Sequence, residues 1–264
     1  MLFFINIFIF TSLVFSSNIF NSSMFQISKI DGKSTEILFH APEISITKDI
    51  DGYSKFEESD LIGLNSQNEE IILPVYSTAF QMNPGYDYEI NFEVINSHII
   101  EDVNFKNFDE NNSGFFPNKN INLSEPQIMR GLVLGQVSFT PYKYFIDEKK
   151  LEIYDAVQIN ITETNQIGFD YFIPEKKSYI FDELYEDLVI NYSRSDRSED
   201  YQTPSILYIC GGSSINNAYF QELVDWRHKQ GYIVTVVSTN ETGSSENNIN
   251  NYIENAYLNW ENPP

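Results

Sequence analysis

The last stretch of the chain, Ser205 to Trp260, constrains the fold most because it predicts parallel α/β structure. Ser205–Cys210 and Tyr232–Ser238 are short apolar runs rich in β-branched residues, and a helical pattern lies between them. Apolar residues then recur at helical spacing from Ile249 to Trp260, which predicts a second helix. A parallel sheet needs several strands with both faces covered. We therefore expect this βαβα segment to begin a larger domain, and the chain to be a fragment of a longer protein.

The order of segments in this region carries a resemblance. Leu223–Tyr232, which contains Trp226-Arg-His-Lys-Gln-Gly231, precedes the second apolar run, and Asn251–Pro264 ends in Trp-Glu-Asn-Pro-Pro. These segments resemble the start of the catalytic domain of gingipain-type cysteine peptidases, family C25. In that family a strand ending in a Gly-Asp-His-like stretch comes next, and a catalytic His and Cys follow. The resemblance implies a caspase-like α/β fold and proteolysis, with the catalytic pair beyond Pro264.

The N-terminus predicts an exported protein. Leu2–Phe15 is an apolar segment, and small residues around Ser16 suit a signal peptidase, so residues 1–16 are predicted to be a signal peptide cleaved at Ser16. A transmembrane helix would need about 20 apolar residues. No Lys or Arg precedes the apolar segment, so a retained anchor and a buried strand stay open as alternatives. The expected location is outside the cell or on its surface.

Composition excludes several classes of partner. The net charge is −22, with 38 acidic and 16 basic residues, and this charge repels nucleic acid and anionic membrane surfaces. Hydrophobic residues make up 42% of the chain, which is enough for a buried core. The single cysteine allows no disulfide within the chain. We expect neither nucleic acid nor, after signal cleavage, a membrane as partner.

The segment between the signal and the α/β start predicts antiparallel strands. Ile71–Met82 and Tyr86–Val94 flank Asn83-Pro84-Gly85, which suits a type II turn, and the second strand alternates polar and apolar residues. Gly131–Thr140 and Leu151–Ile161 form a second predicted pair with a polar turn between them. Glu101–Glu125 is predicted to be a long loop with one short strand at most. The expected product is a β-sandwich.

This β region also carries motifs in a recognisable order: Leu73-Pro-Val-Tyr76, the Asn83 turn, Arg130-Gly131 before a strand, Pro141-Tyr-Lys-Tyr144 and Leu151–Ile159. They resemble the gingipain propeptide. The resemblance implies a β-sandwich that assists folding of the peptidase, contacts the catalytic domain in cis and blocks its cleft until cleaved. The strand pattern alone would suit any extracellular binding module.

A domain boundary is predicted near residue 190. Apolar spacing from Tyr179 to Ile190 predicts a short helix, and residues 191–204 are polar, charged and free of aliphatic side chains. The expected domains are therefore residues 1–16, 17–190, a linker at 191–204, and 205–264. Arg194 and Arg197 are the candidate maturation sites because an exposed linker suits proteolysis. An ordinary solvated linker without cleavage is the open alternative.

No residue of this chain is predicted to be catalytic. Cys210 ends a strand, whereas His228 lies near the far end of the following helix, so we expect them to lie roughly 15 to 20 Å apart, given about 1.5 Å per helical residue. His40 and His98 have no metal-ligand spacing and are expected to be structural. The turn at Gly211–Ser214 favours capping over anion binding. The resemblance implies no cofactor, although calcium binding by full-length members stays open.

Two functions from different classes follow. The first is the N-terminal part of a secreted gingipain-like cysteine endopeptidase precursor that acts on proteins or peptides. The second is a secreted β-sandwich module for binding or adhesion, without catalysis.

Overall fold

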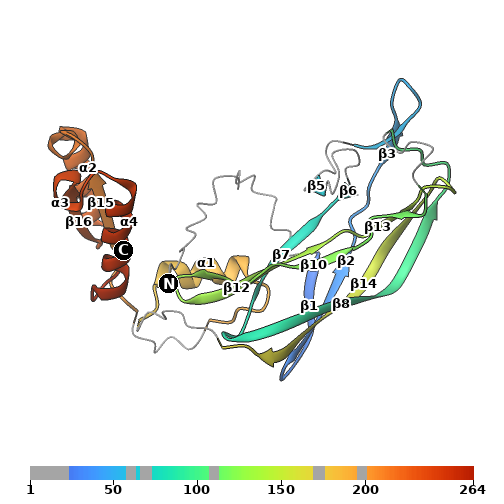
Figure 1. The fold of residues 1–264 in the computed structure, drawn as a ribbon, viewed down its shortest axis with the longest axis horizontal. Coiled ribbons are helices and arrows are strands. Elements are labelled where there is room, and N and C mark those ends of the chain that lie inside the picture. Colours follow the sequence, from blue (N-terminus) through green and yellow to red (C-terminus); the bar gives the residue numbers. More distant parts are fainter. Residues whose placement is uncertain (1–23, 58–63, 66–72, 107–112, 169–175, 195–200) are drawn as a thin grey trace. The chain divides into compact units, whose positions relative to one another are not determined.

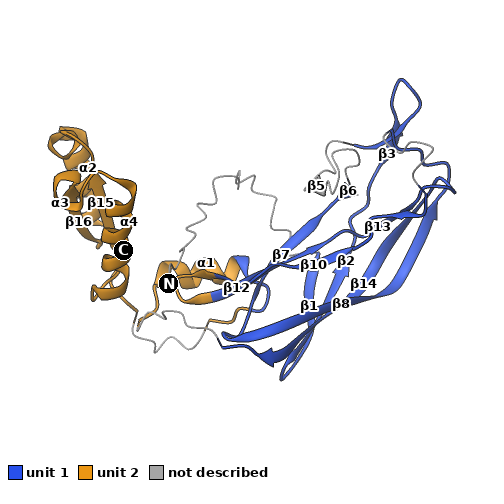
Figure 2. Cartoon of the chain, viewed as in Figure 1, with its two compact units in different colours: residues 1–127, 133–169, 188–191 blue, residues 128–132, 170–187, 192–264 orange. Residues whose placement is uncertain are grey.

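The computed structural model describes residues 24–57, 64–65, 73–106, 113–168, 176–194 and 201–264 (Figure 1). The chain divides into two compact units (Figure 2). We call residues 1–127, 133–169 and 188–191 the two-sheet unit, and residues 128–132, 170–187 and 192–264 the α/β unit. The expected signal peptide lies outside the described residues, and the predicted domain boundaries stay predictions.

The larger sheet of the two-sheet unit has six antiparallel strands, and its longest strands, β8 and β14, pair along most of their length. The strands in spatial order are β1 (Phe25–Asp31), β2 (Ser34–His40), β14 (Lys150–Gln166), β13 (Tyr142–Phe145) and β9 (Phe115–Phe116), with β8 (Tyr86–Ile100) on the other side of β14.

A second sheet of four strands is built around β12. Its members are β10 (Ile121–Leu123), β12 (Leu132–Phe139), β11 (Gln127–Met129) and β7 (Tyr76–Gln81). The described part of the unit also contains two small ribbons: β3 (Ile46–Lys48) with β4 (Ser54–Phe56), and β5 (Leu64–Asn65) with β6 (Leu73–Pro74). The segment predicted to be a long loop thus contains two short strands, β9 and β10.

The predicted strands exist, but their predicted pairing is wrong. The turn at Asn83–Gly85 forms, with Gly85 at a φ of 79°. The strands on either side of it nevertheless enter different sheets, because β7 pairs with β12 and β8 pairs with β14. The polar turn after β13 closes a hairpin of β13 with β14, not of β12 with β14. Alternation determines which face of a strand is buried, but it does not determine which strand is its neighbour.

Aromatic side chains fill the space between the two sheets. Phe39 on β2 lies 5.1 Å from Phe139 on β12 and 5.7 Å from Tyr76 on β7, measured between ring centroids. Phe92 on β8 also lies 5.1 Å from Phe139. The Tyr76 and Tyr142 hydroxyls share a buried hydrogen bond of 3.1 Å. Each of these contacts joins one sheet to the other, so the sheets pack face to face.

The predicted α/β elements are confirmed. β15 (Ser205–Cys210) and β16 (Ile233–Ser238) are parallel and in register from Ser205 opposite Ile233 to Cys210 opposite Ser238. Asn217 caps the connecting helix by accepting hydrogen bonds from the backbone N–H groups of Tyr219 and Phe220. The helical elements of the described residues are α1 (Tyr179–Leu188), η2 (Ser214–Asn216), α2 (Ala218–Lys229), α3 (Thr239–Thr242) and α4 (Glu246–Asn259). Within the described part of the chain, no helix is both long and apolar enough to cross a bilayer.

Candidate functional site

The candidate Cys-His pair is separated by the topology. Cys210 is buried at the carboxyl end of β15, and His228 is in the last turn of α2. His98 lies in the two-sheet unit, where its Nδ1 is 2.7 Å from Asp155 Oδ1, and His40 ends β2. The described residues contain no group of three or more His, Cys, Asp or Glu side chains arranged to hold a metal. The contacts that connect different parts of the chain lie elsewhere, around α1.

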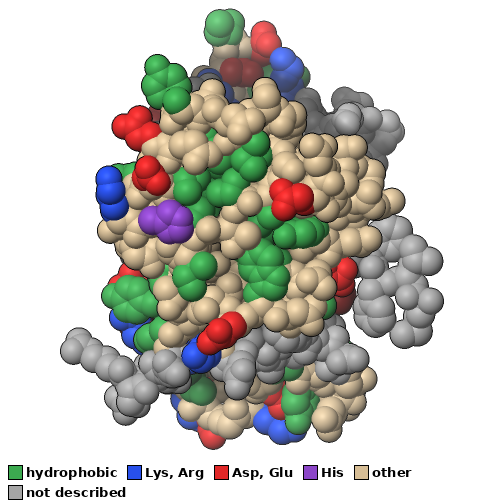
Figure 3. Space-filling model, turned by 90° about the vertical axis from the view of Figure 1, so that its left-hand side faces the viewer, with side chains coloured by type: hydrophobic (Ala, Val, Ile, Leu, Met, Phe, Trp, Pro, Cys, Tyr) green, Lys and Arg blue, Asp and Glu red, His purple; other side chains and the backbone are tan. Residues whose placement is uncertain are grey.

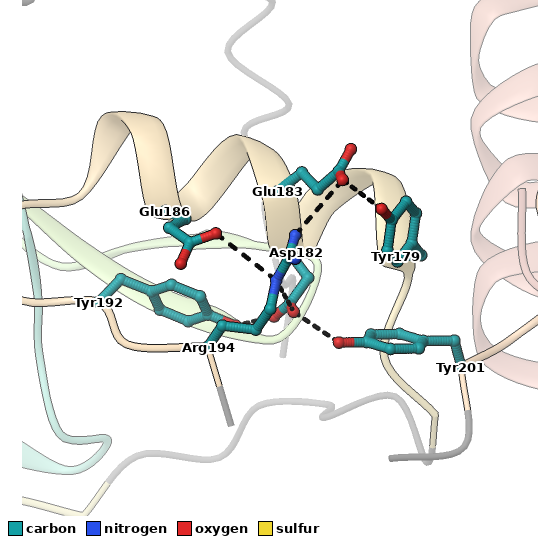
Figure 4. A network of polar contacts seen from close by, with 7 residues as sticks. All are labelled: Tyr179, Asp182, Glu183, Glu186, Tyr192, Arg194 and Tyr201. Atoms are coloured by element: carbon teal, nitrogen blue, oxygen red, sulfur yellow. Dashed lines mark hydrogen bonds and ion pairs between the residues drawn. The ribbon is translucent and has the colours of Figure 1, made fainter. Parts of the chain in front are cut away.

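The first of these contact groups centres on Asp182, which is buried in the first turn of α1 (Figure 4). The Tyr201 hydroxyl donates a hydrogen bond of 2.7 Å to its Oδ2, and the Tyr192 hydroxyl donates to its Oδ1. Arg194 forms an ion pair with the same carboxylate, with Nε 3.1 Å from Oδ2. We call Asp182, Tyr192, Arg194 and Tyr201 the Asp182 clamp.

The Asp182 carboxylate of the clamp is ionised at neutral pH. Burial raises the pKa of Asp182, but the hydrogen bonds from Tyr192 and Tyr201 and the nearby Lys177 and Arg194 outweigh it, so this pKa lies below its ordinary value. Burial, with the bond to Asp182 next, raises the pKa of Tyr192 far above its usual range, so this hydroxyl keeps its proton. In the clamp, the Asp182 carboxylate thus accepts hydrogen bonds from two phenol groups and pairs with one guanidinium.

Two further carboxylates hold Arg194. Its Nη2 lies 3.6 Å from Glu183 Oε1 and its Nε lies 3.6 Å from Glu186 Oε2. The guanidinium carbon also lies 5.4 Å from the centroid of the Tyr179 ring. Glu186 follows Asp182 by four residues and Glu183 by three, so it lies one helical turn beyond both of them on α1. Arg194 is therefore held by α1 rather than displayed to solvent, and its side chain is 25% exposed.

The second contact group centres on Arg130, at the tip of the β11–β12 hairpin. Arg130 and Gly131 both have positive φ, at 45° and 83°, as a tight hairpin turn requires. The Arg130 guanidinium carbon lies 4.7 Å from the centroid of the Phe181 ring on α1 and 5.9 Å from that of Tyr257 on α4. This sandwich buries much of the cation, and burial lowers the pKa of Arg130, which still stays charged.

The same arginine reaches the segment after α4. Its Nη2 donates a hydrogen bond of 3.1 Å to the carbonyl of Pro263, and its Nη1 donates to Pro264. Gln202, which is buried, donates a second hydrogen bond of 3.0 Å to the Pro263 carbonyl. Arg130 from the hairpin tip and Gln202 from the linker therefore donate to the same carbonyl, which belongs to Pro263 in the segment after α4. We call Arg130, Gln202 and Pro263, with the Phe181 and Tyr257 rings, the Arg130 junction.

Of the predicted site residues, the structure describes one and leaves two outside the described residues. Arg194 lies in the clamp, whereas Arg197 and Ser16 lie outside the described residues, so cleavage at any of them stays a prediction. Sequence reasoning missed Asp182, because an acidic residue on a short helix is usually solvated. The signal that could have revealed the clamp is the acidic face of α1 next to a linker rich in arginine and tyrosine.

On the face drawn in Figure 3, hydrophobic side chains gather in separate patches with acidic side chains around them. Exposed apolar residues of α2 include Tyr219, Leu223 and Trp226, which recur at helical spacing. The described structure does not show what covers this stripe.

These features define a class of protein: a two-sheet β module, then a linker held by α1, then parallel α/β structure. Residues 90–199 match the model of the C25 propeptide family, Propeptide_C25. This region of the chain is therefore similar to the propeptide of C25 peptidases.

Two curated proteins are similar to part of this chain. Gingipain R1 of Porphyromonas gingivalis is 24% identical over 147 residues, which covers 54% of this chain and 15% of the relative. A second gingipain R1 sequence of that species has the same identity and is covered over 8% of its length. The chain thus spans a small part of the curated relatives it matches.

Two solved structures are also similar. The complex of the P. gingivalis RgpB pro- and mature domains gives a TM-score of 0.49 at 22% identity, over 65% of this chain and all of that chain. A structure of gingipain K from P. gingivalis, described for its zymogenic latency, gives a TM-score of 0.43 at 9% identity, over 53% of this chain and 92% of that chain.

Proposed function

We propose that this chain is the N-terminal part of a secreted C25 cysteine endopeptidase precursor. The observation that carries the proposal is the order of its parts, because a C25 propeptide match ends at residue 199 and parallel α/β structure starts at Ser205. In this proposal residues 205–264 begin a caspase-like catalytic domain whose Cys and His lie beyond Pro264. The thiolate attacks a peptide carbonyl of a protein substrate, with the imidazole as base.

The two-sheet unit, as a β-sandwich, is proposed to assist folding of the peptidase and to cover its cleft in cis. The match of residues 90–199 to the C25 propeptide family supports this role. The precursor is further proposed to lose its signal at Ser16 and to mature by cleavage in the linker.

The reading frame beyond Pro264 tests the proposal. We expect another strand ending in a Gly-Asp-His-like stretch, followed later by a Cys after an apolar strand. A stop codon or a run of further β repeats would instead support the secreted binding or adhesion module.

The purified 264-residue chain should not hydrolyse casein under reducing conditions. The reason is that Cys210 is buried at the end of β15, while His228 lies in the last turn of α2, so neither can activate the other. The measurement is casein hydrolysis by the chain and by a Cys210→Ala variant. Thiol-dependent hydrolysis that disappears in the variant would show that the chain has its own catalytic pair.

A further inference from the structure

Helix α2 presents apolar side chains to solvent. Tyr219, Leu223 and Trp226 are 82%, 38% and 51% exposed, and they recur at intervals of four and three residues, so they line one face of the helix. We call these three residues the α2 stripe. The packed face of α2 lies beside the stripe, where the Phe220 ring lies 5.4 Å from that of Tyr208 on β15. The stripe is therefore additional to the face that α2 uses within its own unit.

The tryptophan of the stripe is held in place. The Arg227 guanidinium carbon lies 4.8 Å from the centroid of the Trp226 ring and 5.6 Å from that of Tyr232. Trp, Tyr and Arg are the residues that most often carry the binding energy of protein interfaces. A side chain that is ordered before binding also loses less conformational entropy when a partner covers it. Trp226 thus has the properties of an interface anchor.

The charge of α2 differs from that of the other helices. Within the described part of the chain it is the one helix that contains Lys or Arg, and Arg227 and Lys229 balance Glu222 and Asp225. By contrast, α1 has four acidic residues and α4 has two, with no Lys or Arg in either. Because the net charge of the chain is −22, two copies repel each other overall, and α2 is a surface where this repulsion is weak.

The order of charges along α2 is self-complementary. Glu222 and Lys229 lie seven residues apart on the same side of the stripe, and Leu223 and Trp226 lie between them. When two copies of α2 lie antiparallel, Leu223 of each copy packs beside Trp226 of the other. Glu222 of each copy then lies near Lys229 of the other. A twofold axis at the centre of the helix therefore matches apolar residues with apolar residues and each acid with a base.

We propose that α2 is a self-association surface, through which two copies of this chain pair antiparallel in solution. The apolar stripes are in contact, and a Glu222–Lys229 pair lies at each end. One helix per partner makes an interface smaller than the standard of about 1,600 Å², so the dimer should be weak, with a Kd of the order of tens of micromolar. The proposal does not rest on the proposed function, because it concerns only the surface of α2.

Sedimentation velocity of the full 264-residue chain, at concentrations on both sides of that Kd, tests the pairing. The apparent mass should rise from one copy toward two. Leu223→Ser should raise the Kd about tenfold, because it places a hydroxyl in the middle of the stripe. Leu258→Ser is the matched control: Leu258 is 41% exposed on α4, compared with 38% for Leu223, and its replacement should leave the Kd unchanged.

Charge reversal tests the antiparallel arrangement. Glu222→Lys and Lys229→Glu should each raise the Kd about fivefold, because both pairs of the dimer then join like charges. An equimolar mixture of the two variants should associate like the wild type, since each reversed residue then faces an opposite charge on the other chain. The substituted side chains are all exposed, and far-UV circular dichroism checks that each variant keeps the wild-type fold.

A single copy at every concentration would overturn the proposal and leave the stripe to another occupant, such as residues beyond Pro264 in the proposed precursor. Association that Leu223→Ser leaves unchanged would also overturn it, because the contact would then lie elsewhere. A mixture that associates no more tightly than the single variants would contradict the antiparallel pairing. None of these results bears on whether the chain is a peptidase precursor, which the reading frame beyond Pro264 tests separately.

Discussion

Replacing Phe39 with alanine should destabilise the two-sheet unit by about 3–5 kcal/mol, the usual cost of removing a buried phenylalanine. Phe39 is fully buried and contacts the rings of Phe25, Tyr76 and Phe139 from both sheets. The variant would leave a cavity where the two sheets meet, and the surrounding rings could fill it only in part.

Urea unfolding followed by far-UV circular dichroism measures this loss. Both tryptophans, Trp226 and Trp260, belong to the α/β unit, so their fluorescence follows that unit separately. Ile50→Ala is the control, because Ile50 is fully exposed in the same two-sheet unit and should cost less than about 0.5 kcal/mol. A Phe39→Ala transition as stable as that of the control would show that the sheets do not share one core.

Replacing Arg130 with alanine should destabilise the α/β unit by about 2–3 kcal/mol, because hydrogen bonds to charged groups contribute about 1.5–3 kcal/mol and cation–π contacts add to this. The Pro263 carbonyl would keep only the bond from Gln202, and the Phe181 and Tyr257 rings would lose the cation between them.

Tryptophan fluorescence during urea unfolding measures this effect, because Trp260 lies three residues before Pro263. Arg130→Lys should recover part of the loss, since an ammonium keeps the charge but not the planar, two-pronged geometry. Lys229→Ala, which removes an exposed cation of α2, is the control for charge alone. If Arg130→Ala and Lys229→Ala unfold alike, the Arg130 junction does not stabilise the unit.

The sequence predicted the α/β segment best, because its signals are local. Strand and helix there follow from the spacing of apolar residues, and Asn217 and Ser245 cap α2 and α4 from within a few residues. In the two-sheet unit the strands were predictable but their partners were not. The β1–β2 hairpin was missed, although Gly32, the first of the two turn residues between Asp31 and Ser34, is favourable there because its φ is positive, at 56°.

The candidate site was the least predictable part. Arg194 attracted attention as a basic residue in a polar linker, but its ion pairs with α1 depend on how the linker returns to that helix. Arg130 was noted only as the residue before a strand. Its contact with Pro263 joins positions 133 residues apart, and no local pattern predicts such a contact.

The most direct test of the central claim uses the peptidase matured from the complete reading frame. Adding the purified 264-residue chain should abolish its hydrolysis of casein at near-equimolar amounts, because the proposed inhibitory propeptide would cover the cleft of the mature enzyme as a separate chain as well. The Phe39→Ala chain, with its two-sheet unit destabilised, should inhibit less. Undiminished hydrolysis at a large excess of the folded chain, or a reading frame that yields no peptidase, would contradict the account.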